Sequence, residues 1–171
     1  MMRRKTFVSS ALLAASLLLV SFASCVETLP VSALSLDELT PRQKEILCAP
    51  NDGHDYGGVV QKMQDNDIER VGMNHLKIKG RDFVYHDFVR IGDVAASYLV
   101  VYCGPWDWTS SWRFIVHQLL FLPDYTSVEL INLDTLEVVR TFKVRGHVEC
   151  VILSGATLYL RFENGKYGKG G

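Results

Sequence analysis

Toward its carboxyl end the chain becomes a succession of short apolar runs separated by polar turns. The runs occupy residues 127–132, 137–144, 147–153 and 156–162. Asp134-Thr135, Arg145-Gly146 and Ser154-Gly155 stand between them. β-branched and aromatic residues favour strands, and such short connections join antiparallel neighbours. This pattern predicts an antiparallel meander, and no other feature of the chain constrains the fold as strongly.

The middle of the chain continues the β pattern, and two short helices are predicted before it. Residues 76–79 alternate apolar and basic side chains, and residues 97–103 form an apolar run typical of a buried strand. A helix is predicted to begin at Pro41, because Thr40 can cap it and Gln43 completes a capping box. A second short helix is predicted over 59–67. The predicted fold class is mainly β, an antiparallel meander, sandwich or partial barrel with one or two short N-terminal helices.

The first residues of the chain are typical of an export signal. Three basic residues precede the uncharged stretch Thr6 to Ser24, whose apolar centre is 11–20. That centre has the length of a signal peptide and is short for a bilayer span, although the whole uncharged stretch could just cross as an anchor. The predicted organisation is a signal peptide (1–24), a tether (25–34), one β-rich domain (35–163) and a flexible tail (164–171).

The end of this segment, Phe22-Ala23-Ser24-Cys25, resembles a bacterial lipobox. In that family, small residues precede a cysteine that is diacylated on sulfur and becomes the first residue of the mature chain. The match departs from the usual pattern at Phe22, where the family usually has Leu. The resemblance implies lipid attachment at Cys25 and a membrane-anchored lipoprotein in the bacterial cell envelope, at the outer membrane or the cell surface. The alternative is cleavage after Ala23, which would give a secreted protein without lipid.

Charge excludes nucleic acid as a partner. The chain has 18 basic and 19 acidic residues, and residues 1–24 hold three of the basic ones and none of the acidic ones. A mature chain with 15 basic and 19 acidic residues has a net charge of -4. Such a chain has no positive excess with which to neutralise phosphates.

Four cysteines offer a framework for disulfides, namely Cys25, Cys48, Cys103 and Cys150. Exported proteins form disulfides in an oxidising compartment. With Cys25 lipidated, we predict one bridge between Cys103 and Cys150, because both lie in predicted strands. Two alternatives remain open: buried thiols without a bridge, or two bridges if Cys25 keeps its thiol.

An aromatic cluster is the strongest candidate for a binding surface. All three tryptophans lie within seven residues. The predicted ligand-binding residues are Tyr102, Trp106, Asp107, Trp108 and Trp112. Aromatic rings on a loop can stack on sugars or anchor a protein partner, and a carboxylate can bind hydroxyl groups. Equally, the rings can fold back onto the sheet and close its core.

Two His-Asp pairs support an alternative function. His54-Asp55 and His86-Asp87, together with His75, could assemble a metal site for a hydrolase, because imidazole and carboxylate groups bind zinc. Their spacing matches no metal-binding motif, and no nucleophile elbow is present. The sequence therefore favours a binding module for a glycan or a protein over an enzyme, with no catalytic residue, metal or cofactor assigned.

Residues Tyr125 to Glu163 resemble one blade of a β-propeller of the YVTN type. The matching parts are 127–132, the turn Asp134-Thr135, 138–144 and 157–160. A blade cannot bury both of its faces alone, so the resemblance implies further blades beside it. An ordinary antiparallel meander would give the same pattern, and the two interpretations stay open here.

Overall fold

The computed structural model describes residues 27–49, 55, 57–104 and 125–171. These residues form three sheets and two short helices, and the predicted mainly β class is confirmed. The pairings are antiparallel except at one short N-terminal strand. Within the described ranges, no helix is long and apolar enough to cross a bilayer.

The central sheet is an antiparallel meander with a parallel strand added at one edge. Its strand order is β1-β9-β8-β7-β6. The strands are β1 (Glu27–Thr28), β6 (Val89–Ala95), β7 (Tyr98–Cys103), β8 (Tyr125–Asn132) and β9 (Glu137–Arg145). Register irregularities in β6 and between β8 and β9 mark β-bulges, which bend and twist the sheet.

Two smaller sheets flank the central sheet. The carboxy-terminal sheet has the order β10-β11-β12-β2, and the small sheet has the order β3-β4-β5. The carboxy-terminal sheet contains β10 (Val148–Ser154), β11 (Thr157–Phe162), β12 (Tyr167–Gly170) and β2 (Ser32–Ala33). The small sheet contains β3 (Ile68–Gly72), β4 (His75–Ile78) and β5 (Arg81–Val84). The helical elements are the 3-10 turn η1 (Leu36–Glu38) and the helices α2 (Pro41–Leu47) and α3 (Val59–Asp65).

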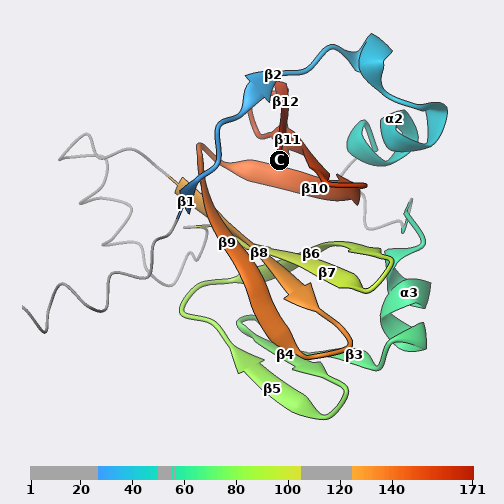
Figure 1. Cartoon of the computed structure of the whole chain (residues 1–171), viewed down its shortest axis with the longest axis vertical. Coiled ribbons are helices and arrows are strands. Elements are labelled where there is room, and N and C mark those ends of the chain that lie inside the picture. Colours follow the sequence, from blue (N-terminus) through green and yellow to red (C-terminus); the bar gives the residue numbers. More distant parts are fainter. Residues whose placement is uncertain (1–26, 50–54, 56, 105–124) are drawn as a thin grey trace, which may run out of the picture.

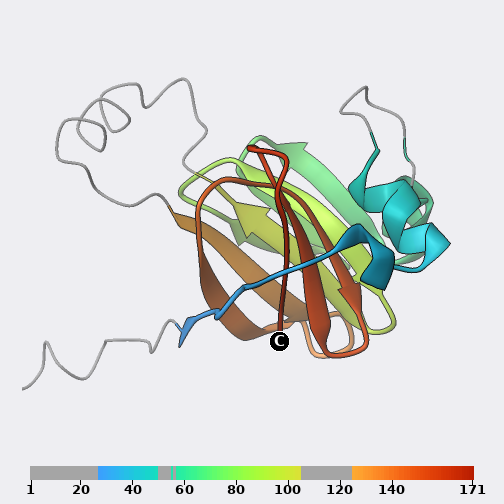
Figure 2. The same cartoon turned by 90° about the horizontal axis from the view of Figure 1, so that it is seen from above.

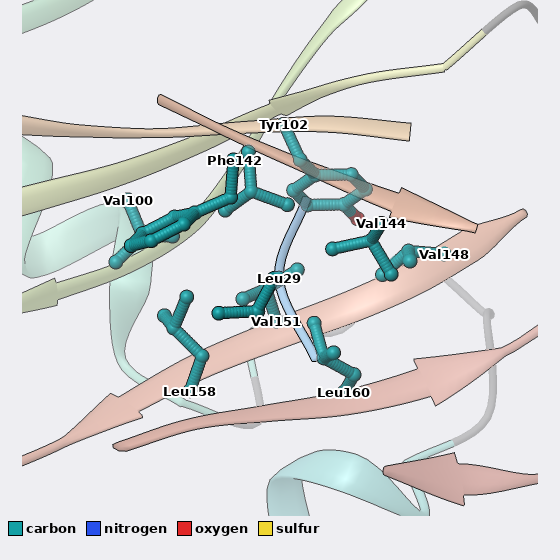
Figure 3. Packing of buried hydrophobic residues seen from close by; sticks show 10 residues of the cluster. Leu29, Val100, Tyr102, Phe142, Val144, Val148, Val151, Leu158 and Leu160 are labelled. Atoms are coloured by element: carbon teal, nitrogen blue, oxygen red, sulfur yellow. The ribbon is translucent and has the colours of Figure 1, made fainter. Parts of the chain in front are cut away.

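The sheets stack in layers with the central sheet in the middle (Figures 1 and 2). One apolar cluster joins the central and carboxy-terminal sheets, and Figure 3 shows its side chains converging between the strands. A second cluster joins the central and small sheets, and a third lies under η1 and α2 on the outer side of the carboxy-terminal sheet. Each apolar face is thereby buried against a neighbouring layer.

The first strands of two consecutive meanders, β6 and β10, pass very close to each other. A Cβ built on Gly92 of β6 would lie 2.8 Å from the carbonyl oxygen of Val151 in β10. Only glycine permits this approach of two backbones.

The segment that resembles a propeller blade, 125–163, contributes β8 and β9 to the central sheet and β10 and β11 to the carboxy-terminal sheet.

Helix α2 is capped at both ends by side chains. Thr40 Oγ1 accepts a hydrogen bond from the Gln43 amide at 3.3 Å, and Gln43 Oε1 accepts one from the Thr40 amide at 2.9 Å. This is the capping box that the sequence predicts. At the other end, the Arg161 guanidinium donates to the carbonyls of Leu47 and Ala49 at 2.9 and 2.5 Å. The Arg161 bonds join the end of α2 to β11 of the carboxy-terminal sheet.

From Glu27 on, the segment predicted as a tether belongs to the folded domain. β1 pairs with β9 in the central sheet, and β2 pairs with β12 in the carboxy-terminal sheet. Leu29, between the two strands, is 4% exposed and lies inside the core of Figure 3. The prediction failed because Pro30 discourages regular structure locally, whereas the burial of Leu29 is decided by distant residues.

The glycine-rich end of the chain is likewise a strand and not a flexible tail. Gly168 and Gly170 alternate along β12 and both face the N-terminal segment. Added Cβ atoms would lie 2.4 Å from Val31 Cγ1 and 2.8 Å from Leu29 Cδ2, respectively. The glycines therefore make room for the N-terminal segment that crosses β12. The prediction of a flexible tail was wrong because a high glycine content is also typical of flexible chain.

The predicted bridge between Cys103 and Cys150 is absent, because both residues are free thiols. Cys103 packs against the cluster between the central and small sheets. Cys150 packs against the cluster under α2. The two side chains thus point away from each other, with the core of the sandwich between them. Cysteines with diverging Cβ directions cannot be bridged without moving the backbone.

Candidate functional site

An open cleft of about 520 Å³ lies at one end of the sandwich, where the N-terminal segment crosses from one sheet to the other. Its walls are the turn between β9 and β10, the turn between β11 and β12, and the segment that joins β1 to β2. The lining residues are Thr28, Leu29, Val31, Ser32, Ala33, Arg145, Gly146, His147, Phe162, Glu163, Asn164, Lys166 and Tyr167.

The first turn is fixed by a buried hydroxyl group. Thr126 Oγ1 donates to the Gly146 carbonyl at 2.8 Å and accepts from the Val148 amide at 3.1 Å. Thr126 itself is fully buried. Gly146 has a φ of 102°, a conformation that side-chain-bearing residues rarely adopt. The wall that carries Arg145 and His147 is therefore held from beneath.

The second turn is fixed in a similar way and is linked to the first. Asn164 Oδ1 accepts from the Lys166 amide at 3.1 Å, and the Phe162 amide donates to the Lys166 carbonyl at 2.9 Å. The Glu163 amide donates to the His147 carbonyl at 3.1 Å, which joins the two turns. Both walls therefore belong to one hydrogen-bonded unit, and the cleft is formed before any ligand arrives.

The third wall is anchored at each of its ends. The Leu29 amide donates to the Lys143 carbonyl at 3.0 Å, and the Leu34 amide donates to the Tyr167 carbonyl at 3.1 Å. Between these bonds, Val31 presents a half-buried apolar side chain to the cleft, whereas the Leu29 side chain is buried in the core beneath it. The segment from Glu27 to Leu34 is thus a wall of the cleft and also links the central sheet to the carboxy-terminal sheet; we call it the clasp.

The cleft combines an apolar floor with a charged rim. Val31 and Phe162, both half-buried, supply apolar surface, while Arg145 and Lys166 are exposed at the rim. Glu163 and Asn164 add a carboxylate and an amide there. Ligand sites are typically concave, of 300–1,000 Å³, with a few polar groups over apolar surface. This cleft suits a ligand with an apolar face and an acidic or hydroxyl-bearing edge.

The structure gives Tyr102 a different role from the predicted one. Tyr102 is 5% exposed in the core of Figure 3, and its hydroxyl donates to the Glu149 carbonyl at 2.5 Å. Burial raises the pKa of its phenol to about 12. It is a core residue that ties β7 to β10, and its prediction as a ligand-binding residue is wrong.

Other predicted binding residues lie outside the described part of the chain. These are Trp106, Asp107, Trp108 and Trp112, together with the lipid-attachment residue Cys25. Tyr125, the first described residue after the tryptophan-rich segment, pairs with Arg145 on β9.

The His-Asp pairs form no metal site within the described residues. Among them, no group of three or more ligating side chains could hold an ion. Asp55 instead binds the start of α3, because its carboxylate accepts from the amides of Val59 and Val60 at 2.7 and 2.9 Å. His75 pairs with Asp82 at 2.9 Å across β4 and β5. His54 lies outside the described residues.

The buried thiols are poor nucleophiles. Burial raises the pKa of Cys103 to about 12, with the carboxylates of Glu129 and Asp87 adding to the shift. Burial likewise raises the pKa of Cys150 to about 11. The reactive form of cysteine is the thiolate, which these two residues do not form near neutral pH.

Sequence reasoning missed the cleft, although two signals for it are present. Turn residues occur at Arg145-Gly146 and Asn164-Gly165, and alternating glycines follow the second turn. Neither signal identifies the N-terminal segment as the third wall. No protein-family model, curated protein or solved structure matches this chain.

Proposed function

We propose that this chain is a lipid-anchored protein of the bacterial cell envelope that binds a ligand in the cleft at the end of its sandwich. The cleft is the single observation that carries the binding role. It is preformed, it has the volume of a ligand site, and it places two exposed cations above apolar surface.

The chemistry of the cleft favours a ligand with negative charge. Arg145 and Lys166 reach the rim from two different turns, so they can contact two edges of one ligand. Arginine binds carboxylate and phosphate groups in a bidentate manner, and Phe162 offers an aromatic ring below. An acidic sugar or an acidic peptide segment presents this combination of groups.

The anchoring role is supported by the lipobox-like residues that end in Cys25. Two acyl chains on one residue give effectively stable attachment, since each buried methylene contributes roughly 0.8 kcal/mol. The domain would then be displayed outside the cytoplasm. The tryptophan-rich segment remains a predicted second contact for a glycan or a protein.

Anchoring is tested by the intact mass of the mature protein purified from its host. A chain that begins at Cys25 and carries a mass of lipid size supports the proposal. A bare chain that begins at Ser24 contradicts it. A Cys25→Ala variant that is still exported but released from the membrane would assign the attachment to that residue.

Binding is tested by titrating the isotope-labelled protein with a panel of uronic-acid oligosaccharides and glutamate-rich peptides. We expect amide shifts at Gly146, His147 and Lys166. Lys166→Ala should weaken binding several-fold, whereas Lys77→Ala, an exposed lysine in the small sheet, should leave it unchanged. Shifts confined to other surfaces, or none across the panel, would contradict the role of the cleft.

A further inference from the structure

The outer edge of β9 is only partly covered. β1 pairs with Phe142 and Lys143 and with no other residue of β9. In the described part of the chain, residues 137–141 have no strand on that side. An uncovered edge exposes backbone polar groups, and proteins usually protect such edges with charge or with a covering partner.

The side chains on this edge are two apolar residues and three cations. Val138 and Val139 are 46% and 52% exposed, and Arg140, Lys143 and Arg145 are also exposed. Arg140 lies against the Phe142 ring, with its guanidinium carbon 5.4 Å from the ring centre. Tyr125, 40% exposed, stands opposite Arg145. The acidic residue of β9 is Glu137 at its start.

The anchor leaves the domain at the same edge. Glu27 is aligned with Phe142, and Cys25 precedes Glu27 by two residues. Two residues of extended chain span at most about 7 Å. A lipid on Cys25 would therefore be attached within about 7 Å of the position of Glu27 beside the β9 edge.

We propose that the β9 edge, formed by Val138, Val139, Arg140, Lys143 and Arg145, rests on the bilayer surface beside the acylated cysteine. This orientation depends on the lipid anchoring proposed above. The exposed valines of the edge suit contact with a membrane, and the neighbouring Tyr125 on β8 is of the type enriched at the membrane interface. The three cations suit the anionic headgroups there, although the mature chain as a whole is acidic.

The orientation has a consequence for the ligand. Arg145 belongs to the β9 edge and also lines the cleft. The cleft therefore opens next to the bilayer. A ligand with negative charge that is itself attached to the envelope would meet the cleft at membrane level.

The test measures the membrane contact of two exposed valines in the acylated protein. Val139→Cys and Val60→Cys are each made in a Cys48→Ser background, which removes the exposed native thiol. Both valines are 52% exposed, and Figure 1 shows β9 and α3, which carries Val60, on opposite sides of the molecule. Each cysteine receives an environment-sensitive fluorophore. The proteins are then reconstituted in vesicles of phosphatidylethanolamine and phosphatidylglycerol.

We expect spin-labelled lipids to quench the label at position 139 by more than half and the label at position 60 hardly at all. Equal quenching at both positions, or quenching at neither, in a protein that floats with the vesicles would overturn the orientation and leave the anchoring intact. A protein without lipid that does not float would contradict the anchoring and the orientation together.

Charge reversal gives a second readout. Lys143→Glu should reduce quenching at position 139 in vesicles rich in phosphatidylglycerol and should change little in vesicles of phosphatidylcholine. Lys77→Glu, which makes the same change on the outer face of the small sheet, should reduce it in neither. A reduction of equal size for the two variants would contradict a specific role for the β9 edge.

Discussion

The two faces of the central sheet are closed by different parts of the chain. Toward the small sheet, the buried residues all fall between Ile68 and Leu133, within one continuous stretch of sequence. Toward the carboxy-terminal sheet, the cluster extends from Leu29 to Leu160 and needs both ends of the chain. One face is thus closed by residues from a single stretch of sequence, whereas the other also uses the N-terminal segment that crosses from β9 to β12.

The difference shows where this fold depends on distant contacts. Local meanders bury their faces with short loops, at a small cost in chain entropy. The clasped face forms only when the N-terminal segment reaches β9 and β12. Because that segment is also a wall of the cleft, the face that is harder to close carries the proposed binding site.

The largest expected effects come from removing one leucine on each face. Leu29→Ala and Leu76→Ala each truncate a buried side chain, which typically costs about 2–5 kcal/mol of unfolding free energy. The two variants should differ in hydrogen exchange. Leu29→Ala should accelerate exchange in β2 and β12, and Leu76→Ala in β4 and β5. If both variants accelerate the same strands, the two faces are not separate units.

Gly92→Ala should cost somewhat less, about 1–3 kcal/mol, because the new methyl group would press against the β10 backbone. Gly72→Ala is the matched control, since its nearest atom would be an ordinary 3.7 Å contact with His75 Cβ. Urea denaturation compares the two variants. An equal cost at both positions would show that the approach of β6 to β10 is not tight.

The meanders were predictable because their signal is local. Turn pairs such as Ser154-Gly155 and alternating apolar residues identify strands within a few residues of sequence. The capping box at Thr40 and Gln43 is equally local, and the structure confirms it. Such short-range rules gave the fold class, but they could not show which sheets would stack.

Failures occurred wherever a distant partner decides the structure. Leu29 lies in a segment with a proline, and Gly168 lies in a run of glycines, so local rules predict irregular chain at both positions. The glycines of β12 leave room for the N-terminal segment: Val31 lies against Gly168, and Leu29 lies against Gly170. Cys103 and Cys150 were expected to face each other because strand predictions do not say which side of a sheet faces which layer. The cleft was missed for the same reason.

Asp93→Asn should destabilise both faces by a smaller amount, about 1–2 kcal/mol. The Asp93 carboxylate accepts from Lys62 Nζ at 3.0 Å and from the Leu153 amide at 3.2 Å, so it links α3, β6 and β10. Asparagine keeps one acceptor and loses the charge. Thermal unfolding monitored by circular dichroism would measure the loss, and Asp134→Asn in an exposed turn is the control. A loss no larger than that of Asp134→Asn would show that the Asp93 carboxylate does not stabilise the packing of α3, β6 and β10.

The smallest expected effect is a dependence on pH of the contact between η1 and β12. Lys169 of β12 donates to the Glu38 carboxylate, and this hydrogen bond, with one from the Ser35 amide, holds the pKa of Glu38 below its usual value of 4.5. A group whose pKa is lower in the folded state stabilises that state above its unfolded pKa, and the stabilisation is lost as the pH falls through the folded pKa. Acidification below 4.5 should therefore loosen η1 from β12. An NMR titration of the Glu38 carboxyl carbon measures the pKa, and Lys169→Met should return it toward 4.5. An unchanged pKa in that variant would show that Lys169 does not stabilise the Glu38 carboxylate.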